Sequence, residues 1–219
     1  YKPGSSSEMI FSSDGGIFYT SSADQSYPAF EERNKDYNSL QFYTCDINPM
    51  EGFDTYIGGL QDNGSLYYQG NPLGINDMVD GGDGAYCFFD DDQPMYFMTS
   101  VYYNRYSVFF NGNQSNYLDY YSGVFINPAD YDYRMNTLYA NAVDFFGSSN
   151  NDKILRVTNV LSNDNGTYMD LNTGSDVYFS HIRYSPYSTE SSATVFVGSN
   201  SGRLFRLDNA QAVPAVTEI

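Results

Sequence analysis

The chain has 219 residues, with 27 Asp or Glu against 10 Lys or Arg, so its formal net charge is −17. A surface this acidic repels nucleic-acid phosphates and anionic membranes, and no apolar run reaches the ~18 residues of a spanning helix, so we expect neither partner. The 23 Tyr, 19 Gly and absence of Trp are typical of many short strands joined by tight turns, which predicts an all-β domain.

The first element expected is a hairpin over residues 8–22, in the stretch EMIFSSDGGIFYTSS. Its corner is Asp14-x-Gly16, in which the Asp carboxylate would accept hydrogen bonds from the turn. We interpret residues 1–39 as a leading blade fragment. The chain opens on YKPGSSS with neither Met nor signal peptide, which indicates an internal piece of a longer polypeptide.

The next corner lies in GGLQDNGSLYY, residues 58–68. The dipeptide Asn63-Gly64 accepts positive φ at both central positions, as a type I′ hairpin requires. We therefore predict a structural turn at Asp62 and Gly64, with strands on either side that are rich in β-branched and aromatic residues.

Two marks then recur along the chain. Strands end in a polar residue plus Pro, and a corner of the form Asp/Asn-x-Gly follows the second strand. The prolines are Pro49, Pro94, Pro128 and Pro186, and the last clear corner is Asn200-x-Gly202, with degenerate corners around Asn111 and Asn150. A period of about 45 residues predicts a β-propeller of four-stranded antiparallel blades. We place blades near residues 40–83, 84–121, 122–176 and 177–219, as part of a larger propeller; a β-sandwich of about 14 strands is the alternative.

The corner SSDGGIFY resembles the Asp-box (BNR) repeat of sialidases, sortilin-type receptors and xyloglucan-degrading propellers. Ser12, Asp14 and Gly16 match that repeat, whereas Phe18 and Tyr19 stand where Thr and Trp are usual. The wider pattern over residues 3–145 is similar to the large secreted, sortilin-like propellers of Bacteroidetes, many of which use type IX secretion. The resemblance implies a propeller fold and export to the medium or the cell surface, but it implies little about activity.

An acidic, glycine-rich loop is expected over residues 77–84, within NDMVDGGDGAY. Asp77, Asp80 and Asp83 offer the oxygen ligands that Ca²⁺ prefers, although the spacing of an EF-hand is absent. Asp80 and Asp83, with Tyr86, would alternatively bind a carbohydrate, or the loop is simply solvated. The run Asp90–Asp92 is interpreted as a solvated turn.

The sequence contains few of the residues that the common catalytic arrangements need. The single histidine, His181, and two cysteines provide neither a Ser-His-Asp arrangement with its elbow sequence nor a usual zinc site. Glycoside hydrolysis needs only two carboxylates, for which Asp62, Asp80 and Asp83 are the candidates. We expect a non-catalytic binding propeller that recognises a glycan or a protein, including surface-anchoring or secretion machinery; a glycoside hydrolase is the alternative.

Two further sets of residues leave alternatives open. Several tyrosines would form platforms on which sugars stack, or would pack between blades. These tyrosines are Tyr102, Tyr103, Tyr117, Tyr120 and Tyr121. Cys45 and Cys87 occupy corresponding places in consecutive inner strands, which permits a disulfide in an exported protein; two free thiols are the alternative.

Overall fold

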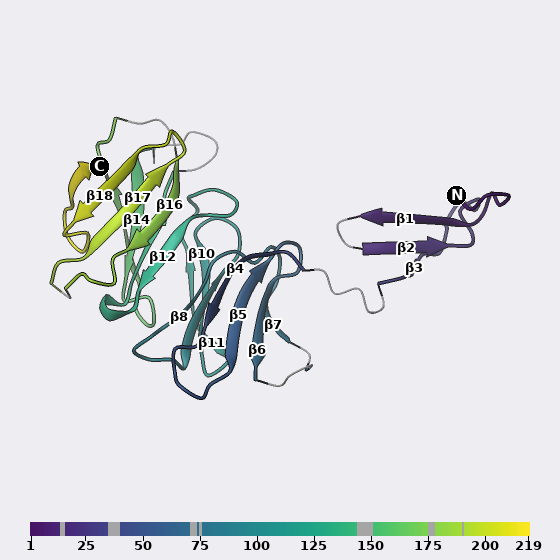
Figure 1. Cartoon of the computed structure of the whole chain (residues 1–219), viewed down its shortest axis with the longest axis horizontal. Coiled ribbons are helices and arrows are strands. Elements are labelled where there is room, and N and C mark those ends of the chain that lie inside the picture. Colours follow the sequence, from purple (N-terminus) through teal and green to yellow (C-terminus); the bar gives the residue numbers. More distant parts are fainter. Residues whose placement is uncertain are drawn as a thin grey trace. The chain divides into compact units, whose positions relative to one another are not determined.

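The computed structural model describes residues 1–13, 16–34, 40–70, 74, 76–143, 151–174, 178–189 and 191–219 (Figure 1). The chain divides into two compact units, Tyr1–Leu40 and Gln41–Ile219. The described residues are almost entirely strands and connections, and their single helical element is a 3₁₀ turn, η1 (Tyr133–Met135). No helix among the described residues is long and apolar enough to cross a membrane.

The smaller unit is a three-stranded antiparallel sheet of β1 (Met9–Ser13), β2 (Gly16–Thr20) and β3 (Glu31–Glu32). The rings of Phe11 and Phe18 stack across β1 and β2 at 5.3 Å, and Phe30 meets Phe11 edge-on at 5.2 Å. The predicted hairpin is confirmed, and Gly16 has a φ of +123°. Asp14 lies outside the described residues, so its predicted role stays a prediction.

The larger unit consists of four four-stranded antiparallel sheets, in each of which the strands follow one another in chain order. The first sheet is β4 (Phe42–Ile47), β5 (Thr55–Leu60), β6 (Ser65–Gln69) and β7 (Asp77–Asp80); the second is β8 (Cys87–Phe89), β9 (Tyr96–Ser100), β10 (Arg105–Phe110) and β11 (Asn113–Asp119). The third is β12 (Ala129–Asp132), β13 (Thr137–Asn141), β14 (Lys153–Thr158) and β15 (Asn165–Asp170); the fourth is β16 (Phe179–Tyr184), β17 (Thr194–Ser199), β18 (Leu204–Asp208) and β19 (Ala215–Glu218).

The sheets pack face to face around three cores (Figure 1). The core between the first and second sheets includes Ile57 and Phe97. Because side chains alternate along a strand, neighbours on β13 enter different cores: Leu138 faces the second sheet and Tyr139 faces the fourth. All five residues of β13 are buried for this reason.

Side-chain acceptors on the first strand of a sheet bind backbone N–H groups on the first strand of the next. Asp46 Oδ2 accepts a 2.7 Å hydrogen bond from Phe89 N, and Asp130 Oδ2 accepts one of 2.8 Å from Tyr184 N. Burial raises the pKa of Asp46. These bonds satisfy N–H groups that would otherwise be left at the edges of the first strands.

The proline pattern is confirmed for three sheets and wrong for one. Pro49, Pro94 and Pro186 follow β4, β8 and β16, but Pro128 immediately precedes β12. The expected strand GVFINP is instead a connection, because Gly123 has a φ of +87° and Val124 N donates a 2.9 Å hydrogen bond to Asn127 Oδ1.

The hairpin predicted around Asp62 is confirmed, but its turn type is wrong. Positive φ occurs at Asp62 (59°) and Gly64 (66°) rather than at Asn63 and Gly64. The reason is a tertiary contact: Gly64 N donates a 2.8 Å hydrogen bond to Gly82 O in the next connection. This hydrogen bond determines the backbone conformation of the four-residue loop 61–64.

The Asn-Gly turn with two positive φ values occurs at Asn111 (50°) and Gly112 (76°), between β10 and β11. The degenerate corner assigned to Asn111 is therefore wrong. This turn follows the third strand of its sheet, whereas the predicted corner follows the second strand. The connection that follows the second strand of this sheet is 101–104. The corner assigned to Asn150 lies outside the described residues, whereas Gly202 has the positive φ (82°) expected of a corner between β17 and β18.

Candidate functional site: an acidic and aromatic surface

The corner edge is the end of the sheets that carries the connections 61–64, 81–86, 101–104 and 120–128. Asp80 lies at this edge at the end of β7, where its Oδ2 accepts a 3.1 Å hydrogen bond from Thr99 Oγ1. Asp77 begins β7 at the opposite end of the sheet, and its Oδ2 accepts a 2.6 Å bond from Gln69 Nε2. The prediction of one loop over residues 77–84 is therefore wrong, because residues 77–80 form a strand.

The three predicted calcium ligands do not gather into one group. Among the described residues, no group of three His, Cys, Asp or Glu side chains could hold a metal ion. The separation of Asp77 from Asp83 along β7 explains this result, since a strand rises about 3.3 Å per residue. The described residues therefore provide no group of three ligands for the predicted calcium ion.

Asp62 and Asp83 do come together at the corner edge. Asp62 N donates a 3.0 Å hydrogen bond to Asp83 Oδ1, so the acceptor that holds this turn is Asp83 and not Asp62 itself. The Asp62 side chain is exposed and makes no hydrogen bond to the described residues. The structure thus places the Asp83 carboxylate against the backbone of Asp62, whose own side chain is exposed to a ligand.

Glycine is required where these two connections meet. Gly84 N donates a 2.9 Å hydrogen bond to Leu60 O, and a Cβ added at Gly84 would lie 2.1 Å from Gly64 O. A Cβ at Gly64 would in turn lie 2.2 Å from Asp80 O. The glycines of GGLQDNG and DGGDGAY therefore allow two backbones to pack directly against each other.

An aromatic ladder lies in the neighbouring connections. The rings of Tyr102 and Phe125 are parallel within 5° at a centroid distance of 5.9 Å. The guanidinium of Arg105 lies 5.5 Å from the Tyr102 centroid and 5.0 Å from that of Tyr121. Tyr103 meets Tyr102 edge-on at 5.5 Å. Contacts therefore run in the order Tyr121, Arg105, Tyr102, Phe125, and we call this set, with Tyr103, the aromatic ladder.

The ladder is open to solvent at its ends. Tyr121 is 79% exposed and Phe125 is 47% exposed. Arg105 is the only cation of the ladder, and its Nε lies 3.3 Å from Asp119 Oδ2. The ladder therefore offers aromatic area without an unpaired positive charge.

The acidic pair adjoins the ladder. Gly82 has a φ of +78°, and a Cβ added there would lie 3.6 Å from Tyr102 Cε1, so the connection with Asp83 runs against Tyr102. On the other side, burial and then the charges of Asp83 and Asp62 raise the pKa of Tyr43. We call this set the corner surface: Tyr43, Asp62, Asp83, Tyr102, Tyr103, Arg105, Tyr121 and Phe125.

Buried asparagines hold the aromatic connections in place. Asn127 Nδ2 donates to Asn104 Oδ1 (2.7 Å) and to Asn141 O (2.9 Å), and Asn104 Nδ2 donates to Asn141 O (2.8 Å). Tyr106 donates its hydroxyl to Asn104 Oδ1 at 2.9 Å. Because every member is hydrogen-bonded, this network fixes both connections to the end of β13.

Two tyrosines of the corner surface have left-handed backbones. Tyr103 has a φ of 65° and Tyr121 one of 41°, which are unusual for aromatic residues. Tyr103 N donates a 3.1 Å hydrogen bond to Phe125 O, and Asn104 N donates a 3.0 Å bond to Ser122 O. Such backbone strain, maintained by surrounding hydrogen bonds, concentrates at functional sites.

The structure assigns packing roles to other predicted residues. Tyr120 donates its hydroxyl to Asp164 Oδ2 at 2.5 Å. Tyr86 is partly buried against the core between the second and third sheets, and burial raises its pKa; its predicted ligand-binding role stays a prediction. Tyr117 is exposed on β11. Asp90 is buried and accepts a 2.7 Å bond from the Tyr131 hydroxyl, so the solvated-turn interpretation is wrong for Asp90.

The two cysteines are free thiols in this structure. Cys45 is exposed, whereas Cys87 points into the core between the first and second sheets. Burial raises the pKa of the Cys87 thiol to about 12. The predicted disulfide is absent because the two side chains occupy different environments.

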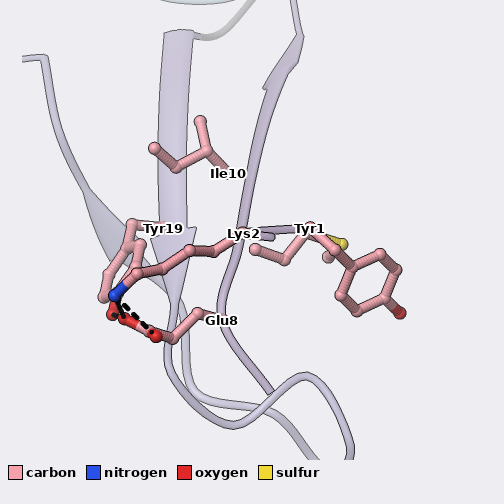
Figure 2. Close-up of a pocket in the computed structure, with 6 residues that line it drawn as sticks. Tyr1, Lys2, Glu8, Ile10 and Tyr19 are labelled. Atoms are coloured by element: carbon pink, nitrogen blue, oxygen red, sulfur yellow. Dashed lines mark hydrogen bonds and ion pairs between the residues drawn. The ribbon is translucent and has the colours of Figure 1, made fainter. Parts of the chain in front are cut away.

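Two hollows are lined by residues that do not belong to the corner surface. The first, of about 300 Å³, belongs to the smaller unit and is lined by Tyr1, Lys2, Glu8, Met9, Ile10 and Tyr19. Figure 2 shows that its polar groups are already paired: Lys2 Nζ lies 2.9 Å from Glu8 Oε2, and Tyr19 donates to Glu8 Oε1 at 3.0 Å. The second, of about 390 Å³, is an apolar hollow on the outer face of the first sheet, lined in part by Phe42, Ile47 and Tyr56.

Sequence reasoning missed Arg105, Phe125 and the asparagine network. The dipeptide Asn104-Arg105 carried no recognised motif, and the segment FINP was interpreted as the end of a strand. Their roles arise only when two connections meet at one edge. A cluster of Tyr and Asn in each connection was the available signal.

The fold is that of a β-propeller, as predicted, and comparison with known proteins supports this class. The chain is similar to the solved β-propeller domain of Cps50 (Swd1) from Myceliophteria thermophila, with a TM-score of 0.61 and 12% sequence identity. The match covers 83% of this chain and 56% of that one, so the chain spans little more than half of the solved domain. No protein-family model and no curated protein matches the sequence.

Proposed function

We propose that the chain is a non-catalytic binding propeller that recognises a glycan or a protein partner through the corner surface. The observation that carries this proposal is an exposed aromatic ladder, held in position by a buried polar network and flanked by Asp62 and Asp83. We further propose that it belongs to a secreted or cell-surface bacterial protein. The acidic surface and the resemblance of Ser12 and Gly16 to an Asp-box support that location.

The arrangement suits binding because its aromatic groups are already ordered. A ligand that stacks on an ordered ring does not have to fix a mobile side chain, which lowers the entropic cost of association. The asparagine hydrogen bonds and the contacts of Arg105 with Tyr102 and Tyr121 provide this order. Aromatic rings also supply large contact areas per residue.

The geometry favours binding over glycoside hydrolysis. A hydrolase of that kind needs one carboxyl group held protonated, commonly by an apolar environment, and a second carboxylate at about 5 to 9.5 Å. Asp62 is exposed, and both oxygens of Asp80 accept hydrogen bonds, from Thr99 Oγ1 and from Gly81 N. The three predicted catalytic carboxylates thus have partners or solvent rather than an enclosed cleft.

Native electrophoresis of the full chain through gels that contain soluble polysaccharides tests the proposal, together with an assay for newly released reducing ends. We expect retardation without release. Tyr121→Ala should abolish retardation, whereas Tyr187→Ala, which removes a tyrosine that is 95% exposed elsewhere, should not. Release of reducing ends that is lost in Asp83→Asn would establish the hydrolase instead.

A further inference from the structure

We infer that the corner surface selects neutral polysaccharides over acidic ones. This inference rests on the proposed function and specifies its ligand class. The selectivity comes from the placement of one arginine and two carboxylates around the aromatic ladder.

Arg105 is largely covered, and a carboxylate already opposes its charge. Its guanidinium lies 5.5 Å from the Tyr102 ring centroid and 5.0 Å from that of Tyr121, and its Nε lies 3.3 Å from Asp119 Oδ2. Its side chain is only 22% exposed. A uronate or a sialate is bound most strongly by a guanidinium that is free to pair with its carboxylate in two-point fashion. Arg105 therefore contributes a planar group to the ladder, and Asp119 already opposes its charge.

The carboxylates of the corner surface favour hydroxyl donors. Asp83 uses Oδ1 to hold Asp62 N, and the Asp62 side chain has no partner among the described residues. Sugar hydroxyls can donate hydrogen bonds to these oxygens, and bonds to a charged acceptor are about twice as strong as neutral ones. An acidic sugar would instead meet two like charges, on a chain whose net charge is −17.

The exposed rings supply the apolar contact that a neutral sugar needs. The Tyr121 ring contacts Arg105, and the residue remains 79% exposed. The C–H face of a pyranose can cover such a ring while its hydroxyls stay at the rim. A sugar chain that runs from Tyr121 past Tyr102 reaches the connection of Gly82 and Asp83, because Gly82 packs against Tyr102.

A proline-rich peptide is the main competing ligand for an aromatic surface. It fits less well, because it has few donors and would remove water from Asp62 and Asp83 without replacing the lost hydrogen bonds. A basic peptide would satisfy the charges, but its binding would fall steeply with salt. Binding of a neutral glycan should be nearly independent of salt.

The test measures the affinity of the full chain for a neutral galactomannan, a neutral soluble glucan and polygalacturonate, at 20 mM and 500 mM NaCl. We expect at least one neutral polymer to bind about tenfold or more tightly than polygalacturonate at low salt, with less than about a twofold change in its affinity at high salt. Tyr121→Ala should remove this binding, and Tyr187→Ala should leave it unchanged.

A second arm tests the origin of the selectivity. Asp62→Asn keeps a residue that tolerates the positive φ of position 62, and combined with Asp83→Asn it removes both charges. At 20 mM NaCl we expect this double variant to show a smaller ratio between its affinity for the neutral polymers and its affinity for polygalacturonate. Polygalacturonate binding equal to or tighter than that of the neutral polymers, lost in Tyr121→Ala, would overturn the inference and leave the binding function intact. If none of the polymers binds through Tyr121 while a proline-rich or basic peptide does, the inference fails and the ligand is a protein.

Discussion

At the scale of single residues, Asp130 shows how the contact between two sheets depends on protonation. Its side chain is buried, with 3% exposure, beside Arg183 Nη1 at 3.2 Å and Tyr184 N at 2.8 Å. Burial raises the pKa of Asp130 to about 6, despite the opposing effect of Arg183 and the backbone donors. In the unfolded chain this carboxyl group has a pKa of about 3.9.

Because the folded state takes up this proton at a higher pH than the unfolded state, the contribution of Asp130 to stability should rise as pH falls from above 6 towards 4. The change should amount to about 3 kcal/mol at most. Asp130→Asn, whose amide oxygen can still accept from Tyr184 N, should lose this part of the pH dependence. Urea unfolding of both proteins at pH 4.5 and 7.5 measures it. Equal pH dependence in the two proteins would refute the assignment.

Gly84 shows how close the backbones approach beneath the acidic pair. Gly84→Ala would place a Cβ 2.1 Å from Gly64 O, a backbone atom that cannot easily move. We expect a loss of about 3 kcal/mol in the free energy of unfolding. Gly81→Ala in the same connection is the matched control, because a Cβ there meets nothing within 4 Å. Thermal unfolding should separate the two variants clearly, and similar melting temperatures would show that the connection rearranges freely.

At the scale of elements, the connections 101–104 and 120–128 depend on asparagines rather than on apolar contacts. Asn127→Ala would leave Val124 N without its acceptor and Asn141 Nδ2 without Asn127 Oδ1. We expect a loss of about 2 to 4 kcal/mol, together with weaker binding through Tyr121, because unpaired buried polar groups are costly. Denaturant unfolding and polysaccharide affinity measure the two effects. Unchanged affinity in a destabilised variant would show that the network supports the fold without organising the site.

The sequence predicted those elements whose signals are local. Strands β5, β9 and β17 follow from β-branched and aromatic runs bounded by turn residues. The strand expected before Pro128 failed because Gly123 and Asn127 close that segment into a connection. The turn type at Asn63 failed because contact with Gly82 overrides the dipeptide preference. In both cases a tertiary hydrogen bond outweighed local propensity.

The candidate site was predictable only in part for a related reason. Asp62 and Asp83 were predicted from segments rich in acidic residues and glycine. Tyr102, Tyr103 and Tyr121 were predicted from segments rich in tyrosine. The contacts that join Arg105 to Phe125 depend on two connections that are separate in the sequence and meet only in the folded structure. No local pattern in the sequence carries that information.

At the scale of the whole molecule, the faces, the first strands and the corner edge of the four sheets have different roles. The faces of the sheets make three apolar cores, and the first strands join neighbouring sheets through Asp46 and Asp130. The corner edge is left to the connections, where sequence can vary without loss of core packing. The corner surface is therefore the part of the described propeller most suited to carry specificity.

Amide chemical shifts of the full chain during titration with a neutral galactomannan or glucan test the central claim most directly. The account predicts that the changes concentrate in residues 61–64, 81–86, 101–104 and 120–128, with no release of reducing ends. Changes centred instead on the first strands or on the apolar face that carries Phe42 and Tyr56, with the corner edge unaffected, would contradict it.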